Sequence, residues 1–232
     1  MSGTQLNKNF ILEGKRRTLR LLNHCFIPWK DPYLGYKLRT RNYLFFIFYY
    51  LVEIPLLSLD CIGMPEWFAF LQFITKKNAR KLHDHELKLA NEIFQHRVDF
   101  SNVMIDEASR VGTQGGKYAF VTYNYINCIG QMTLPIVIHE LVHVVQFKQD
   151  GSRYAIRNLI AHLKQPTYDY GGLERIMQIV NAPDQLHSLN YEQRADVFSD
   201  YCRLLLGQRP EWGNARLQDA IYYYKVIKMM MD

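Results

Sequence analysis

The sequence predicts an α+β domain that follows a helical N-terminal extension. Several segments place apolar residues at helical spacing, whereas two short segments, 103–106 and 119–129, are rich in the β-branched and aromatic residues that favour strands. The first 78 of the 232 residues differ from the remainder, because they combine a basic segment with the most apolar run of the chain. We therefore expect an N-terminal region over 1–78 and a folded α+β domain over 79–232.

Composition places the chain among globular proteins. Apolar residues make up 48%, the 13 glycines and 8 prolines are few, and the four cysteines are scattered, which excludes disordered, collagen-like and disulfide-scaffold classes. The formal net charge of +6 suggests a polyanionic partner, but residues 1–41 alone hold 9 basic and 2 acidic side chains. The rest of the chain is nearly neutral, so we expect no nucleic-acid partner.

The apolar run 43–59 has three interpretations. It forms a buried helix pair with a second apolar patch at 67–74, or an interfacial or re-entrant membrane anchor beside basic residues, or a membrane span. Glu53 fits poorly in hydrocarbon, and the run begins too late for a cleavable signal peptide. A membrane surface is therefore one expected partner of the N-terminal region.

The second part reads as a small, mostly antiparallel sheet accompanied by helices. Pro135 suits the first turn of one of these helices, and Gly207 suits the end of another. We expect an amphipathic helix over 76–98, a strand over 103–106, a strand or tight hairpin over 119–129, and helices over 134–149, 154–163, 190–206 and 215–231.

The helix expected over 134–149 carries the pattern His-Glu-Leu-Val-His. His139 and His143 lie one helical turn apart on the same face, so both imidazoles can reach one zinc ion. Glu140 then projects beside the metal, where it can take a proton from a zinc-bound water and deliver it to a leaving amine. The helix is otherwise apolar, and burying these three polar side chains without a metal would be costly. The pattern predicts one zinc per chain with Glu140 as catalytic residue; the alternative is an ordinary helix with satisfied histidines.

A zinc site of this kind needs a third protein ligand. Glu192 and Asp196 share one face of the helix expected over 190–206, and we assign Glu192 as the ligand and Asp196 as the carboxylate that orients a histidine, most simply His139. His162 and His187 are rival third ligands. Candidates for stabilising an oxyanion or for contacting substrate are Tyr154, Tyr168, Tyr170 and Arg194.

Four blocks of sequence carry a resemblance to a known family. HELVHVVQF, GSRYAIRNLIAHL, PTYDYGG and LNYEQRADVFSDY, in this order, resemble the Vgr-related bacterial zincin-like metallopeptidases. More distantly, they resemble the metallopeptidase core domain associated with contractile injection systems, with its H-E-L-x-H-V-x-Q motif. The preceding ELKLANEIFQHRVDFSNVMID resembles the lead-in of that family, so the resemblance covers roughly residues 86–206.

The resemblance implies a zincin-like core with a gluzincin-type site. It implies His139, His143 and Glu192 as zinc ligands and Glu140 as the base, while Phe147 and Arg194 depart from the residues more usual there. It also implies a bacterial protein that acts in the cytoplasm, at a membrane or after export by a secretion system. The N-terminal 75 residues have no counterpart in the family.

The sequence therefore predicts a zinc-dependent metalloendopeptidase whose substrate is a protein or peptide. The alternative is a module that keeps the zinc for stability and binds a partner without turnover, for example as a secretion-system accessory. The two hypotheses differ in whether the fourth zinc position opens to a cleft or is filled by a side chain.

Overall fold

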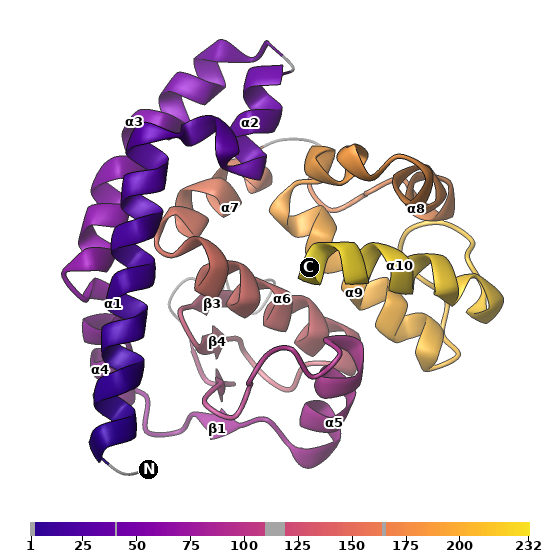
Figure 1. The fold of residues 1–232 in the computed structure, drawn as a ribbon. Helices are drawn as coiled ribbons and strands as arrows, with labels where there is room; N and C mark the ends of the chain where they lie inside the picture. Colours follow the sequence, from indigo (N-terminus) through magenta and orange to yellow (C-terminus); the bar gives the residue numbers. More distant parts are fainter. Residues whose placement is uncertain (1–2, 40, 110–118, 164–165) are drawn as a thin grey trace.

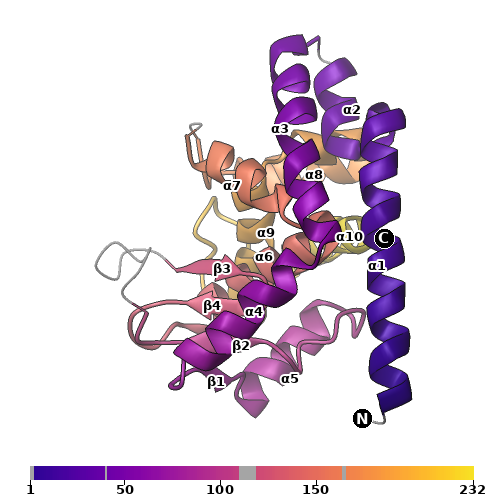
Figure 2. The ribbon, with the colours of Figure 1, turned by 90° about the vertical axis from the view of Figure 1, so that its left-hand side faces the viewer.

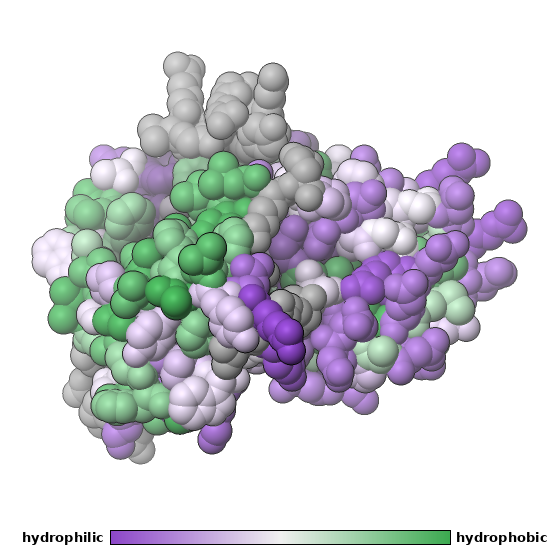
Figure 3. All heavy atoms as spheres, turned by 90° about the horizontal axis from the view of Figure 1, so that it is seen from above, coloured by the Kyte–Doolittle hydropathy of each residue, from purple (hydrophilic) through white to green (hydrophobic). Residues whose placement is uncertain are grey.

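A computed structural model describes residues 3–39, 41–109, 119–163 and 166–232 of the chain. Helices dominate, and one small sheet of four strands packs beside them (Figure 1), which confirms the predicted α+β class. Apolar side chains gather on the side of the molecule that holds the N-terminal helices, and polar side chains gather on the opposite side (Figure 3).

Four helices form the N-terminal region. The helix α3 runs alongside α1, and α4 follows α3 on the same side of the molecule (Figure 2). Gly63 permits the turn between α3 and α4, because its φ of 82° is unfavourable for residues with a side chain. The bounds are α1 (Gly3–Phe26), a 3-10 turn η1 (Pro28–Lys30), α2 (Pro32–Arg39), α3 (Tyr43–Cys61) and α4 (Met64–Thr75).

The four strands form a mixed sheet in the order β1-β2-β4-β3. Two of the three strand pairings are antiparallel, and the pairing of β2 with β4 is parallel. The strand predicted over 103–106 is confirmed. Of the two alternatives for 119–129, a single strand or a tight hairpin, the structure has the hairpin. The strands are β1 (Arg80–Lys81), β2 (Met104–Asp106), β3 (Phe120–Thr122) and β4 (Tyr125–Asn127).

Six further helices complete the described chain: α5 (Asp84–Ile93), α6 (Leu134–Asp150), α7 (Arg153–Leu163), α8 (Gly172–Asn181), α9 (Tyr191–Leu205) and α10 (Ala220–Met231). The helices predicted over 134–149, 154–163 and 190–206 are confirmed. The helix predicted over 76–98 is too long, because β1 pairs with β2 before it and a capping box of His83 and Glu86 starts the helix. The last helix begins later than predicted, after a 3-10 turn η4 (Leu217–Asp219).

The helix α6 lies in the middle of the domain. It packs against α5, α7, α9 and β3, which explains why its apolar residues surround the helix and do not form one stripe. Thr133 precedes it and Pro135 occupies its first turn. It ends at Gly151, whose φ is 66°. Any side chain at this position would collide with the side chains of Asp60 and Arg20. Buried in it are Val137, Ile138, Leu141, Val142, Val144 and Val145.

Ion pairs join the N-terminal helices to α7. The fully buried Glu53 of α3 accepts two hydrogen bonds from Arg157 of α7, at 2.5 and 2.7 Å. Arg157 and Arg153 also contact Asp31 at 3.3 and 2.7 Å. Although burial alone would raise the pKa of the Asp31 carboxyl, these guanidinium groups hold it well below its usual range. Asp60 at the end of α3 accepts from the backbone N–H of Ser152 at 2.9 Å.

The helix α3 is also long and apolar enough to cross a membrane, judged by length and composition alone, and 22% of its apolar 18-residue stretch is buried inside the protein. Of the three interpretations of the apolar run, the buried helix pair therefore fits only the inner side of α3, because the outer side is exposed. The division at residue 78 stays a prediction.

Candidate metal centre

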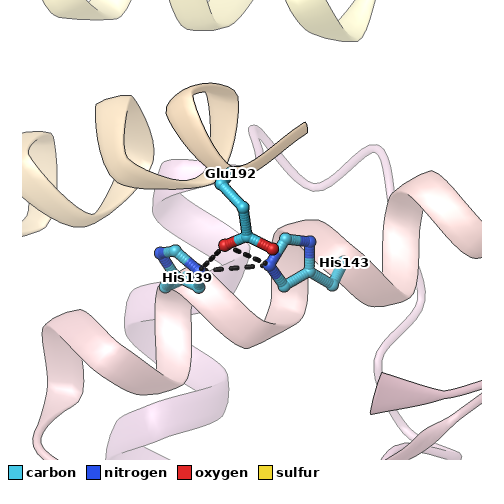
Figure 4. A group of neighbouring side chains, drawn as sticks. All are labelled: His139, His143 and Glu192. Atoms are coloured by element: carbon cyan, nitrogen blue, oxygen red, sulfur yellow. Dashed lines mark hydrogen bonds and ion pairs between the residues drawn. The ribbon is translucent and has the colours of Figure 1, made fainter. Parts of the chain in front are cut away.

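Two helices bring three metal-ligating side chains together. His139 and His143 project from α6, and Glu192 projects from the first turn of α9 between them (Figure 4). The Nε2 atoms of the two histidines are 3.1 Å apart, and Oε2 of Glu192 lies 3.1 and 3.3 Å from them. Ligand atoms bonded to one zinc at about 2.0–2.1 Å and tetrahedral angles are separated by about 3.3 Å, so the spacing fits such an ion.

The second nitrogen of each histidine is held by an acceptor. Nδ1 of His139 lies 2.7 Å from Oδ1 of Asp196, and Nδ1 of His143 lies 2.8 Å from Oε1 of Gln146. The amide nitrogen of Gln146 donates to the Tyr191 carbonyl at 3.1 Å, which fixes its oxygen toward the histidine. Both Nδ1 atoms are therefore donors, which leaves the two Nε2 atoms, next to each other and to a carboxylate, as the atoms that could bind a cation.

The pKa shifts of these groups follow from the same contacts. Burial opposes protonation of His139, but hydrogen bonds to Asp196 and Glu192 raise its pKa well above the usual value, and the charge of Glu192 likewise raises the pKa of buried His143. Burial would raise the pKa of Glu192, yet the neighbouring histidines hold it well below its usual range. Glu192 is therefore ionised and supplies negative charge to the centre.

Glu140 lies beside the three candidate ligands and is not one of them. It is buried, and its Oε2 has no hydrogen-bond partner among the described residues. Burial raises the pKa of its carboxyl group. An unpartnered buried carboxylate is costly, so its persistence points to a role toward a group that enters the site.

A cavity of about 200 Å³ opens in front of the centre. Its lining includes the three ligands, Glu140, Tyr154, Asn158, His162 and Tyr168. The ring of Tyr154 lies 5.8 Å from that of His143, and the ring of Tyr168 lies 6.2 Å from that of His139, so both predicted tyrosines border the site. Burial raises the pKa of Tyr154 well above its usual value, so its hydroxyl stays protonated.

Two other predicted residues lie elsewhere. The Tyr170 hydroxyl donates to Asp200 at 2.7 Å and contacts the Tyr223 hydroxyl at 3.0 Å, within the core between α9 and α10. The guanidinium of Arg194 lies over the ring of Tyr191, 5.9 Å from its centre. Neither residue lines the cavity, so the structure does not bring Tyr170 or Arg194 to the centre.

The rival ligands behave differently from each other. Nε2 of His162 lies 3.1 Å from Oε1 of Glu192, the oxygen that does not face the other two histidines, and its side chain is 42% exposed. His162 therefore borders the centre from the cavity side. His187, in the 3-10 turn η3 (Pro183–Ser188), does not line the cavity.

Sequence reasoning missed two supporting residues. Gln146 follows His143 by three positions on the same helix face, a spacing that could have identified it as the partner of that histidine. The Trp212 indole N–H donates to Oδ2 of Asp196 at 2.6 Å and so fixes the carboxylate that holds His139. No sequence signal connects Trp212 with α9, because it lies in an irregular segment.

We compared the chain with protein-family models, with curated proteins and with solved structures, and none matches it. The fold and the arrangement of the site therefore carry the functional argument by themselves.

Proposed function

We propose that the protein is a zinc-dependent metallopeptidase with His139, His143 and Glu192 as zinc ligands. The observation that carries the proposal is Oε2 of Glu140, which has no partner among the described residues, in the same cavity as two imidazole nitrogens and a carboxylate oxygen within 4.8 Å of one another. The His-Glu-x-x-His spacing on α6 supports it, and we propose both a zincin-like core for residues 79–232 and the kinship with Vgr-related zincin-like proteins that the sequence suggests.

The chemistry divides between the metal and the chain. Zinc in a site of two histidines and a glutamate acts as a Lewis acid, which polarises a carbonyl group and acidifies water. Glu140, whose Oε2 has no partner among the described residues, takes the proton of the attacking water and then delivers it to the leaving amine nitrogen. Tyr154 and Tyr168 line the cavity as donors for a substrate carbonyl oxygen, and His162 lines it with its Nε2 beside Glu192.

The alternative, a zinc-stabilised binding module or secretion-system accessory without turnover, requires the same three ligands but gives Glu140 no task. A structural glutamate would be expected to have a hydrogen-bond partner, and Oε2 of Glu140 has none among the described residues. The open cavity beside the ligands also favours a site that admits substrate. Hydrolysis is therefore the better supported function.

Metal analysis tests the ligand assignment directly. We expect purified protein to hold about one zinc per chain, and His143→Ala to lose it, because two remaining ligands bind zinc weakly. The matched control is His187→Ala, since His187 lies outside the site. Zinc retained at full stoichiometry by His143→Ala and also by Glu192→Ala would overturn the assignment.

Removing the charge of Asp196 should weaken the metal without removing it. In Asp196→Asn, the carboxylate that accepts from Nδ1 of His139 is lost, and we expect zinc affinity to fall about 10–100-fold. Competition with a chromophoric chelator measures the affinity. Asp184→Asn, an exposed acid, is the control and should leave the affinity unchanged. Equal affinities for Asp196→Asn and the unmodified protein would show that Asp196 does not support His139.

A further inference from the structure

The outer sides of α3 and α4 are apolar. On α3 the exposed side chains Leu44, Ile47 and Leu51 recur at the spacing of one helix face, and on α4 the same holds for Trp67, Phe70 and Ile74. We call these six residues the α3–α4 face. Of the 27 large apolar side chains that are exposed among the described residues, 13 lie between positions 43 and 74. Such a concentration marks a surface that contacts something other than water.

On the inner sides of the same helices, polar side chains are buried together with apolar ones, which is unusual for a water-facing helix. Glu53 and Asp60 on α3 are 0% and 1% exposed, and Gln72 on α4 is 6% exposed. Each has a partner inside the protein: Arg157 for Glu53, Ser152 for Asp60 and Thr122 for Gln72. The buried polar side chains of the two helices therefore bond to the domain, and their apolar side chains are left on the outer sides.

Charge identifies the occupant. Exposed basic residues flank the face at both ends, with Arg39 and Arg41 before α3 and Lys77 after α4. The acidic residues between them are withdrawn, since Glu53 and Asp60 are buried and Glu66 is bound by Arg17. An apolar band bordered by cations and by aromatic residues such as Trp67 matches the interface of an anionic lipid bilayer. We propose that the α3–α4 face docks on the surface of an anionic lipid membrane.

Docking along the surface agrees with the packing better than spanning does. A span of α3 would separate Glu53 from Arg157 and place the carboxylate in hydrocarbon. The helix α4 has 12 residues, about 18 Å in length, whereas the hydrocarbon core is about 30 Å thick. An interfacial position keeps both inner sides packed on the domain and immerses only the outer sides.

The helix α4 also adjoins the candidate centre, through side chains outside the α3–α4 face. Met64 and Phe68 of α4 line an apolar cavity of about 510 Å³, and that cavity shares Tyr154, Asn158 and His162 with the cavity of the metal centre. A docked protein would thus present its centre at the membrane surface. On the proposed function, the substrate class is a peptide segment next to the bilayer.

Vesicle binding tests the docking without any need for activity. We expect the full-length protein to sediment with phosphatidylcholine vesicles that contain phosphatidylserine, and more weakly with phosphatidylcholine alone. The affinity of the variant Leu44→Ser/Trp67→Ser for these vesicles should fall at least about tenfold, because two apolar side chains no longer enter the lipid. The matched control Leu217→Ser/Ile221→Ser changes exposed apolar residues at η4 and α10 and should bind as the unmodified protein does.

Tryptophan fluorescence then locates the contact. Brominated lipid should quench the unmodified protein, and Trp67→Phe should lose most of that quenching. Trp29→Phe should keep it, because Trp29 is exposed in η1 outside the α3–α4 face, and Trp212 lies against Asp196 in the domain. The proposal is overturned if the unmodified protein does not bind either vesicle, or if both double variants bind equally. A third outcome also overturns it: the unmodified protein is a dimer, Leu44→Ser/Trp67→Ser is a monomer, and neither of the two proteins binds vesicles. In that case a second copy of the chain covers the α3–α4 face.

Discussion

Replacing Glu140 with glutamine should abolish peptide hydrolysis while leaving the metal in place. The amide has nearly the shape of the carboxylate but cannot accept the proton of the attacking water, and loss of a general base lowers rates by about 10²–10⁴-fold. Among the described residues, no hydrogen bond joins Glu140 to His139, His143 or Glu192, and its Oε2 has no partner, so zinc should remain at one per chain. Cleavage of a fluorogenic peptide mixture, measured together with zinc content, checks both parts.

Glu174→Gln is the matched control, because Glu174 is an exposed glutamate on α8. It should retain full activity. If Glu140→Gln retains full activity too, Glu140 is not the base. If the unmodified protein holds zinc but cleaves no peptide in the mixture, the binding module without turnover becomes the better supported function.

The central part of the site could be predicted from sequence because local geometry determines it. Residues four apart on a helix share a face, so the approach of His139 to His143 follows from helix formation alone. Glu192 required a second step, the packing of α9 on α6, which the sequence indicated only through another helix with two acids on one face. Trp212 could not be found in this way, because its contact with Asp196 depends on how an irregular segment folds back.

The tyrosines show where sequence reasoning ends. Tyr168 and Tyr170 stand two positions apart in one loop, and sequence alone could not tell which would face the centre. The structure turns Tyr168 to the cavity and Tyr170 to Asp200 in the core. The sequence did not predict the helix α8, because its start looks like a loop. The helix begins at the glycine pair 171–172, and Gly171 takes a left-handed conformation with φ of 90°.

Partners far along the chain explain why the N-terminal region allowed three interpretations. The same apolar run suits a core helix, a membrane span or an interfacial helix, and its composition does not separate them. The decisive contact joins Glu53 to Arg157, 104 positions later, and it shows that one side of α3 belongs to the domain.

Substituting Glu53 with leucine should therefore destabilise the protein strongly. Glu53 is fully buried against Arg157, and removing one partner of a buried ion pair costs up to about 3–5 kcal/mol. Asp31, 3.3 Å from Arg157, still compensates part of the remaining charge, so we expect a loss of about 2 kcal/mol or more. Urea unfolding followed by circular dichroism measures the change in the free energy of unfolding. The matched control is Glu13→Leu, which breaks the exposed pair with Arg16 and should cost about 0.5 kcal/mol or less.

The sign of this change separates the arrangements of α3. If α3 spanned a bilayer with Glu53 in hydrocarbon, leucine would remove an unfavourable charge and make the helix more stable in the membrane. With Glu53 held by Arg157, leucine must instead weaken the folded domain in solution, and the double variant Glu53→Leu/Arg157→Leu should lose less than the two single variants added together. Additive losses would show that the two side chains act independently, and the inner side of α3 would then need another anchor on the domain.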